Sequence, residues 1–325
     1  MQKKLSANVI EAIGNTPVVR LNRLTQGLNV EIYVKLEASN PGGSIKDRIA
    51  PFIIADAEKS GRLKPGGTIV EATSGNTGMG LAMCSIIKGY KCVCVMSEKQ
   101  SQDKVNMLKA MGVEVIICPA DVKPDDPRSY YSVAKRLAAE RPNAVLGNQY
   151  NNQANFEAHY LTTGPEIWDQ FDGKIDYYAA GVGTGGTISG TSKFLKEKNP
   201  KLKTFGIDPV GSILTEYHRS GKITEVQPYL VEGVGEDIIP DNVKFEFIDE
   251  FVQVNDEEAI RTLHRLAKEE GIFAGSSSGM AVAGAIKAAQ KLSGGRMLVV
   301  LPDNGSKYLG KFFNREWLAS KGIRI

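Results

Sequence analysis

The sequence predicts an α/β protein of two lobes, with twisted, mostly parallel sheets flanked by helices. Segments that read as strands alternate with segments that read as helices along most of the chain, which is the pattern of parallel sheets covered by helices on both faces. The length of 325 residues suits one two-lobed protein or two modest domains. Apolar residues make up 42% of the chain and charged residues 24%, so the composition can supply a large core.

In the first half of the chain, short β-rich runs alternate with longer helix-forming runs. Gly89 and Gly112 follow two of the longer runs and Pro142 follows a third, as expected just beyond the ends of helices. We expect, in order, a helix over residues 49–59, a strand over 68–72, a helix over 77–88, a strand over 91–96, a helix over 101–110, a strand over 114–118 and a helix over 129–140.

The second half continues the alternation without an internal repeat. Asn255 is expected to cap a helix, because Glu258 lies three residues later in the capping-box position. We expect, in order, a strand over residues 176–180, a helix over 187–198, a strand over 204–208, a helix from 255 to 270, a helix over 278–292 and a strand over 297–301. The polar, turn-rich stretch over residues 142–152 predicts a boundary between the lobes.

Charge and hydrophobicity argue against nucleic-acid and membrane partners. The net charge is only +3 and the basic residues form no block, so no nucleic acid is expected. The N-terminus lacks the continuous apolar core of a signal peptide. The apolar run over residues 80–96 is interrupted by two lysines and a glycine, which predicts a buried helix and strand in place of a membrane span.

The cysteines and histidines predict no metal site. Cys92 and Cys94 alternate in an apolar strand and are expected to point the same way. None of the cysteines has the CxxC spacing of a zinc site, and the histidines show no metal spacing. We interpret Cys84, Cys92, Cys94 and Cys118 as reduced core residues of a cytoplasmic protein.

Two glycine- and hydroxyl-rich loops each follow a predicted strand and precede a predicted helix. Their sequences are Thr73-Ser74-Gly75-Asn76-Thr77-Gly78 and Gly183-Thr184-Gly185-Gly186-Thr187. Such a turn directs backbone N–H groups at the start of the next helix, where the helix dipole helps to hold a phosphate or carboxylate. Glycine often serves only the turn, but two such loops in one chain predict anion binding.

A third loop places a lysine beside a flexible glycine turn. It reads Asn40-Pro41-Gly42-Gly43-Ser44-Ile45-Lys46-Asp47-Arg48, ahead of the helix expected over residues 49–59. The positive end of the helix dipole is unfavourable for a cation there. The same setting lowers the pKa of a lysine toward nucleophilic use, so Lys46 is either an ordinary exposed lysine or a functional one.

Two motifs point to other classes of enzyme. Residues 181–186, Gly-Val-Gly-Thr-Gly-Gly, match GxGxxG, and Asp208 follows near where a ribose-binding acid would lie. An NAD-dependent oxidoreductase is therefore a competing hypothesis, although it leaves the other two loops unexplained. Residues 275–279, Gly-Ser-Ser-Ser-Gly, match GxSxG, but no histidine follows Ser277 as a hydrolase triad of that order requires.

The loops together resemble those of a known family. PGGSIKDR, TSGNTG, GTGGT, the NQY segment and GSSSG fit its pattern, and the resemblance extends from IGNTPVVRLN near the start to LPDNGSKY near the end. The sequence resembles the fold type II pyridoxal-phosphate enzymes, whose fold is tryptophan synthase β-like, and among them the cysteine synthase and cystathionine β-synthase group. This implies a smaller, mobile N-terminal domain over residues 40–145, and a larger cofactor-binding domain formed by 1–39 and 146–325.

The resemblance assigns roles to individual residues, with pyridoxal 5′-phosphate as the cofactor. It implies that Lys46 is the catalytic Schiff-base lysine, that Asn76 binds the ring hydroxyl and that Ser277 faces the pyridine nitrogen. The implied phosphate cradle is Gly183, Thr184, Gly185, Gly186 and Thr187. The implied substrate-binding residues are Thr73, Ser74, Thr77 and Gln149 at the α-carboxylate, together with Tyr150, Gly235 and Glu236.

The resemblance implies β-replacement on serine or an activated serine, with a thiol or sulfide as second substrate. Residues 208–214 and 231–240 resemble the corresponding cystathionine β-synthase loops. We therefore expect L-serine and L-homocysteine to give L-cystathionine. The alternative is the cysteine synthase reaction, in which O-acetylserine and sulfide give cysteine. A non-catalytic relative that serves as a binding partner is a third hypothesis.

Three positions depart from the cystathionine β-synthase pattern. Glu236 stands where tyrosine is usual, Asn148 replaces an aspartate and Phe156 replaces a proline. If Glu236 points inward it adds negative charge near the substrate mouth and changes which thiol or amine is accepted; the alternative is a solvent-facing loop residue. The chain shows no haem-binding extension or regulatory domain, so haem is not expected, and the resemblance implies a homodimer.

Overall fold

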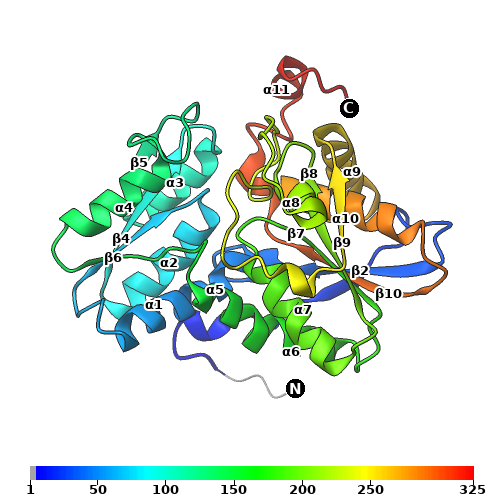
Figure 1. The fold of residues 1–325 in the computed structure, drawn as a ribbon, viewed down its shortest axis with the longest axis horizontal. Helices are drawn as coiled ribbons and strands as arrows, with labels where there is room; N and C mark the ends of the chain where they lie inside the picture. Colours follow the sequence, from blue (N-terminus) through cyan, green and yellow to red (C-terminus); the bar gives the residue numbers. More distant parts are fainter. Residues whose placement is uncertain (1–4) are drawn as a thin grey trace.

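The computed structural model describes residues 5–325 and arranges them around two sheets that lie side by side (Figure 1). Residues 1–4, the basic start of the N-terminus considered above, lie outside the described residues. Both sheets are flanked by helices, and all pairs of neighbouring strands but one are parallel. The predicted α/β class with mostly parallel sheets is confirmed.

The smaller sheet has helices on both faces. In spatial order it consists of β5 (Glu114–Cys118), β4 (Lys91–Ser97), β3 (Thr68–Ala72) and β6 (Ala144–Leu146), and its helices are α1 (Ala50–Lys59), α2 (Asn76–Lys88), α3 (Gln102–Ala110) and α4 (Tyr130–Glu140). Successive side chains of a strand point to opposite faces. Ile69 accordingly packs with Ile53 of α1 and Leu81 of α2, whereas Val70 packs with Val133 of α4.

The larger sheet is built in the same way from segments far apart in the sequence. In spatial order it consists of β1 (Val18–Arg20), β2 (Val30–Leu36), β10 (Gly295–Leu301), β7 (Tyr177–Gly181), β8 (Lys203–Pro209) and β9 (Glu250–Val254). One face carries α6 (Gly164–Gln170) and α7 (Gly186–Lys198), and the other α9 (Asp256–Glu269) and α10 (Ser276–Ala289). Tyr178 packs with Ile167 and Leu195 on the first face, and Ala179 shares the core of the second.

The remaining elements are short. They are α5 (Gln153–Ala158), a π-helical turn (His159–Thr163), α8 (Leu214–Ser220), α11 (Arg315–Ser320) and the 3-10 turns Val9–Ala12, Glu37–Ser39, Ile45–Arg48, Phe245–Phe247 and Gly305–Tyr308. No helix among residues 5–325 is long and apolar enough to cross a membrane. The four cysteines are free; Cys84, Cys94 and Cys118 are buried, and Cys92 packs half-buried against the core.

All helices and strands expected from the sequence are present, and their ends differ by a few residues. The capping box of Asn255 and Glu258 is present at the start of α9. The largest displacement is in α10, which begins at Ser276 rather than 278 and ends at Ala289 rather than 292. It begins early because the Gly275 N–H bonds to the Asp303 carbonyl, 3.0 Å away, and so orients the chain into the first helical turn.

The topology brings the predicted loops to one region. In a parallel sheet, the loops after the carboxyl ends of the strands lie at a common edge and form the usual place for a ligand. The loop after β3 is the first glycine-rich loop, and the loop after β7 is the second. The strands of the smaller sheet come from residues 68–146 and those of the larger from 18–36 and 177–301. The domain limits at 40 and 145 stay a prediction.

Candidate active site

The predicted site residues line two adjoining hollows, which we call the slot and the cleft. The slot is lined by Lys46, Asn76, Gly183, Thr184, Gly185, Thr187 and Ser277, among others. The cleft has a volume of about 410 Å³ and is lined by Lys46, Ser74, Gln149, Tyr150, Gly235 and Glu236, among others. Lys46, Ser74 and Thr184 line both hollows. Lys46 therefore lies where the slot and the cleft meet.

Lys46 sits in a 3-10 turn that is anchored on both sides. The Ser44 hydroxyl caps the turn by accepting the Lys46 N–H, 3.3 Å away, and the Ile45 N–H donates to the Pro302 carbonyl at 2.8 Å. The Lys46 ammonium donates to the Thr184 hydroxyl at 3.4 Å and forms no ion pair within residues 5–325. Burial lowers the pKa of Lys46 to about 8, although nearby carboxylates act to raise it.

The second glycine loop leaves the start of α7 open toward the slot. Gly185 has a φ of +87°, and a side chain there would collide with the Val243 backbone nitrogen, 2.5 Å from the β-carbon position. Only glycine fits this turn. No backbone N–H from Gly183 to Ile188 donates a hydrogen bond to any group in the described chain. These free donors and the helix dipole are suited to holding an anion at the slot.

Polar side chains fix the loop from behind. The Thr187 hydroxyl lies 3.1 Å from His159 Nε2, and His159 Nδ1 lies 2.9 Å from the Thr163 hydroxyl. Burial, with the nearby charges of Lys46 and an arginine, keeps the pKa of His159 well below its usual range, so this ring is neutral. Asn155 donates to the Thr184 hydroxyl at 3.0 Å. Gly186 packs against Asn155 and does not line the slot.

The first glycine loop is braced in the same manner at the start of α2. Gly75 has a φ of +114°, and a β-carbon there would meet the Lys104 side chain at 2.9 Å. The Thr73 hydroxyl accepts the Gly75 N–H at 2.9 Å, and the Thr77 hydroxyl donates to Gln149 Oε1 at 2.6 Å. Thr73 and Thr77 are buried behind the loop, so the structure brings Ser74 and Gln149, but not these two hydroxyls, to the cleft wall.

Asn76, the first residue of α2, is held by residues that follow β10. Its side-chain amide donates to Asp303 Oδ2 at 2.8 Å and accepts from the Lys307 ammonium at 2.9 Å. The Tyr308 hydroxyl donates to the same Asp303 oxygen at 2.7 Å. One N–H of the Asn76 amide remains without a partner in residues 5–325. The orientation of Asn76 toward the slot is thus set by side chains some 230 residues away in the sequence.

Ser277 lies in the first turn of α10 and lines the slot. Its hydroxyl has no hydrogen-bond partner within the described residues. Asp208, the expected ribose-binding acid of the competing hypothesis, has a different use. Its carboxylate accepts the Thr215 N–H at 3.1 Å and the Thr215 hydroxyl at 2.7 Å, at the start of α8. Asp208 therefore holds a helix and does not line either hollow.

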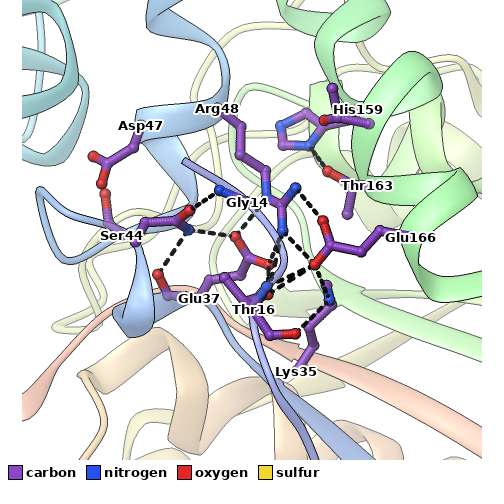
Figure 2. A network of polar contacts seen from close by, with 12 residues as sticks. Gly14, Thr16, Lys35, Glu37, Ser44, Asp47, Arg48, His159, Thr163 and Glu166 are labelled. Carbon is purple, nitrogen blue, oxygen red and sulfur yellow. Dashed lines mark hydrogen bonds and ion pairs between the residues drawn. The ribbon is translucent and has the colours of Figure 1, made fainter. Parts of the chain in front are cut away.

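Arg48, two residues after Lys46, lies in a buried ion network (Figure 2). It forms hydrogen-bonded ion pairs with Glu37 at 2.7 Å and Glu166 at 2.9 Å, and Lys35 joins Glu166 at 2.7 Å. Thr16 adds hydrogen bonds to both carboxylates. Two cations and two carboxylates balance, so the network attaches the turn to the N-terminal segment and to α6 without leaving a net charge buried.

Glu236 points inward and not to solvent. It is 8% exposed, and its carboxylate oxygen lies 3.6 Å from the β-carbon position of Gly183. Gly235, with a φ of +74°, packs against Pro209. Burial, together with the neighbouring carboxylate of Asp237, raises the pKa of Glu236 well above its usual range. Of the two alternatives left open by the sequence, the inward orientation is the one observed.

Several residues that support the site were not expected from the sequence. Asp303 and Lys307 lie in the LPDNGSKY segment, directly after a predicted buried strand. Polar residues at the carboxyl end of a parallel strand often belong to a ligand site, so the sequence could have indicated these two. Asn155 and Glu71 carried no such signal, because their role depends on tertiary contacts. The Gln149 N–H donates to Glu71 Oε1 at 3.4 Å, and burial raises the pKa of Glu71 to about 8. Residues 5–325 contain no cluster of side chains suited to a metal ion.

Comparison with known proteins gives concordant results. Residues 9–303 match the family described as "Pyridoxal-phosphate dependent enzyme". The chain is 46% identical to the cystathionine β-synthase of Rattus norvegicus over 323 residues, which cover 98% of this chain and 57% of that protein. It is 44% identical to cysteine synthase 1 of Emericella nidulans, covering 97% of this chain and 86% of that protein.

A solved structure matches over almost the whole fold. The crystal structure described as an O-acetylserine dependent cystathionine β-synthase from Helicobacter pylori superposes with a TM-score of 0.87 and 36% sequence identity. The match covers 95% of this chain and 98% of that one. The chain thus spans a little over half the length of the rat relative, and nearly all of the bacterial structure.

Proposed function

Because the chain belongs to the pyridoxal-phosphate-dependent enzymes of fold type II, we propose that it catalyses β-replacement on L-serine. In the preferred reaction, L-serine and L-homocysteine combine to give L-cystathionine and water. The carbon–oxygen bond at the serine β-carbon breaks, and a carbon–sulfur bond forms in its place. The alternative is cysteine synthesis from O-acetylserine and sulfide, which is favoured by the likeness to a cysteine synthase over most of both chains.

The observation that carries the proposal is the position of Lys46. Lys46 lines both the slot and the cleft, together with Ser74 of the first glycine loop and Thr184 of the second. A cofactor phosphate and a substrate carboxylate can therefore be held on either side of one lysine. The competing hypothesis, an oxidoreductase that binds a dinucleotide at the Gly181–Gly186 loop, does not explain the position of Lys46 or the first glycine loop.

The slot suits pyridoxal 5′-phosphate. The open N–H groups of residues 183–188 would hold its phosphate, with Thr184 and Thr187 beside them. Asn76 would bind the ring hydroxyl through its remaining N–H, and Ser277 would offer an uncharged hydroxyl to the ring nitrogen. When bound, the cofactor supplies an electron sink for bonds at the α-carbon of an amino acid.

Lys46 would anchor the cofactor and then move protons. With a pKa of about 8, about a tenth of its amine is neutral at pH 7, so it can act as a nucleophile or a base. It would take the proton from the substrate α-carbon and deliver a proton to the leaving hydroxide. The Thr184 hydroxyl, which accepts the Lys46 ammonium at 3.4 Å, would orient the amine between the two tasks.

The first glycine loop would bind the substrate carboxylate. The Asn76 and Thr77 N–H groups at the start of α2 have no partner in the described chain, and Ser74 adds a hydroxyl at the cleft wall. Gln149 is held in place by the Thr77 hydroxyl and by its own bond to the Ala72 carbonyl at 2.7 Å. Thr73 would act by bracing the loop, and a fixed carboxylate would direct the α-carbon toward Lys46.

The remaining features of the proposed enzyme derive from its family. We propose a cytoplasmic homodimer that acts on small amino acids and a thiol or sulfide. The smaller domain over residues 40–145 would move relative to the larger one when substrate binds. The two sheets, which draw their strands from separate parts of the chain, support this division.

A substrate panel tests the proposal. Purified protein with its cofactor is incubated with serine, O-acetylserine or cysteine, each crossed with homocysteine and sulfide, and products are identified by mass spectrometry. Cystathionine from serine and homocysteine is expected. Cysteine from O-acetylserine and sulfide alone would favour the alternative, and a yellow protein without turnover would indicate a binding protein. Borohydride reduction followed by peptide mapping should place the cofactor on Lys46.

A further inference from the structure

The loop between α8 and β9 carries two buried glutamates in opposite environments. Glu232 is 5% exposed and forms ion pairs with Lys104 at 2.8 Å and Lys311 at 2.9 Å. Glu236 is almost as buried, but no ion pair or hydrogen bond to its carboxylate is formed within residues 5–325. Both glutamates line the cleft. The Glu232 carboxylate is thus compensated by two cations, whereas the Glu236 carboxylate has no cationic partner within residues 5–325.

The backbone holds Glu236 in its inward position. The Glu236 N–H donates to the Ser212 hydroxyl at 3.1 Å, and the Glu236 carbonyl accepts the Ile213 N–H at 3.2 Å. Its carboxylate oxygen lies beside Gly183, at the boundary between the slot and the cleft. Because both backbone groups are bonded, the loop conformation that directs the Glu236 side chain into the cleft is fixed.

Aromatic side chains line the cleft together with Glu236. The Tyr130 and Tyr150 hydroxyls lie 3.3 Å apart, and the Tyr131 and Tyr150 rings meet edge to face with centroids 5.3 Å apart. Aromatic faces beside a carboxylate are the usual surroundings of a bound ammonium group. Lys99 also lines the cleft, but it lies over Tyr229, 5.9 Å from the ring centroid, and forms no ion pair with Glu236.

A buried carboxylate without a cation is unfavourable, since it loses hydration without compensation. The pKa of Glu236 is accordingly raised well above its usual range, by burial and by Asp237, and the positive charges of Lys46 and Lys99 only partly oppose this. A ligand ammonium would restore the ionised state of Glu236. An incoming anion would offer Glu236 no such pairing, and the exposed Asp237 would repel it.

We propose that Glu236 binds the ammonium group of the second substrate, so that the cleft selects an amine-bearing thiol over hydrosulfide or a thiol that carries only a carboxylate. The proposal rests on the β-replacement proposed above and names the group by which its second substrate is recognised. Glu236→Gln would retain the shape of the wall and remove the selection.

Binding of unreactive thioethers tests the recognition directly. The cofactor-bound protein is titrated calorimetrically with 3-(methylthio)propylamine and with its neutral counterpart 3-(methylthio)propan-1-ol. Glu236→Gln is expected to weaken amine binding at least tenfold and alcohol binding less than twofold. Glu225→Gln is the matched control, because Glu225 is an exposed glutamate of the same loop that lines neither hollow. Equal amine affinity in wild type and Glu236→Gln would overturn the proposal.

Turnover with matched thiols separates recognition from catalysis. The thiols are homocysteine, 3-amino-1-propanethiol, 4-mercaptobutyrate and hydrosulfide. Glu236→Gln should raise the KM of the two amine-bearing thiols at least tenfold and leave the other two within threefold. An equal loss of kcat with all four would assign Glu236 to proton transfer and overturn the proposal. If Glu236→Gln weakens amine binding but the wild type turns over none of the thiols, the recognition by Glu236 is supported and the proposed β-replacement is contradicted.

Discussion

The two sides of one short turn, Ile45–Arg48, differ sharply in how they treat a positive charge. Arg48 is 2% exposed and bonded to two carboxylates, and these partners raise its pKa further despite its burial. Lys46, two residues earlier, has no ion pair in the described chain and a pKa lowered to about 8. The same backbone thus holds one cation permanently charged and leaves its neighbour ready to lose a proton.

The difference shows how stability and reactivity are divided within the turn. The network of Arg48, Glu37, Glu166 and Lys35 joins the turn to three other segments, and each charge in it is paired (Figure 2). A buried pair of this kind is strongly destabilising to break. Lys46 can remain without an ion pair, and therefore reactive, because the network and the backbone bonds of the turn hold its position.

Removing Lys46 should give the largest loss of activity with little loss of stability. We expect Lys46→Ala to reduce turnover by roughly 10³–10⁴-fold, because both the anchor and the proton carrier are lost. The free energy of unfolding should stay within about 1 kcal/mol, since no ion pair is broken. Steady-state kinetics and urea unfolding measure the two quantities. Lys46→Arg is the control, and activity in this charge-conserving variant would contradict the proposed role.

Removing Arg48 should have the reverse pattern. Arg48→Met leaves Glu37 and Glu166 without their shared cation, and we expect unfolding to become easier by about 3–5 kcal/mol. Urea unfolding measures the change. The matched control is Arg141→Met, because Arg141 pairs with Glu114 at 2.6 Å on the surface and should contribute less than about 1 kcal/mol. Equal effects of the two substitutions would refute a special role for the buried network.

Glu166→Gln should sharpen the comparison through its pH dependence. Burial opposes ionisation of Glu166, but the bonds and charges of Arg48 and Lys35 lower its pKa to about 2. A carboxylate with a depressed pKa stabilises the fold above the ordinary pKa of about 4.5, and this stabilisation is lost as the pH falls toward 2. The wild type should therefore exceed Glu166→Gln by about 1–3 kcal/mol above pH 5, and the difference should shrink below pH 4.5.

This prediction is checked by urea unfolding of both proteins between pH 7 and pH 3. A stability difference that stays constant down to pH 3 would show that Glu166 contributes by its shape rather than by its charge. Thr16, which donates to the same carboxylate through its N–H at 2.7 Å, would still bond to the amide oxygen of glutamine. The part of the stability difference that disappears at low pH therefore measures the contribution of the ion pairs with Arg48 and Lys35.

The sequence was sufficient for the elements with regular patterns. The strand over Thr68–Ala72 and the cap of α9 were predicted because local periodicity and capping chemistry determine them. β2 and β9 were not expected. β2 contains Lys35, which reads as a solvent-facing residue but is fully buried by its pairing with Glu166. Such a strand is recognised only when its distant partner is known.

The same distinction holds for the site. The glycine loops were found because tight turns at helix starts restrict the residue types. The turn left the role of Lys46 open, and the resemblance to a known family assigned it. Asn155 and Asp303 were missed because they act on residues far along the chain, Thr184 and Asn76. The direction of Glu236 was left open for a related reason. It depends on the Ser212 hydroxyl, which no local pattern connects to it.

The smallest effect tests the protonation of Lys46 itself. In protein freed of its cofactor, a pKa of about 8 means that the neutral fraction of the Lys46 amine rises from about one tenth at pH 7 to nine tenths at pH 9. Acetylation of Lys46, followed by mass spectrometry, should level off above pH 9. Ordinary lysines, with a pKa of about 10.4, should keep gaining reactivity.

Glu236 provides the control for this titration, because its carboxylate acts to raise the pKa of Lys46 against the effect of burial. Glu236→Gln should therefore move the midpoint of Lys46 acetylation to lower pH, while Arg48→Met, on the far side of the turn, should not lower it. A midpoint near 10 in the wild type would mean that Lys46 is as well compensated as Arg48. In that case the contrast between the two sides of the turn would disappear.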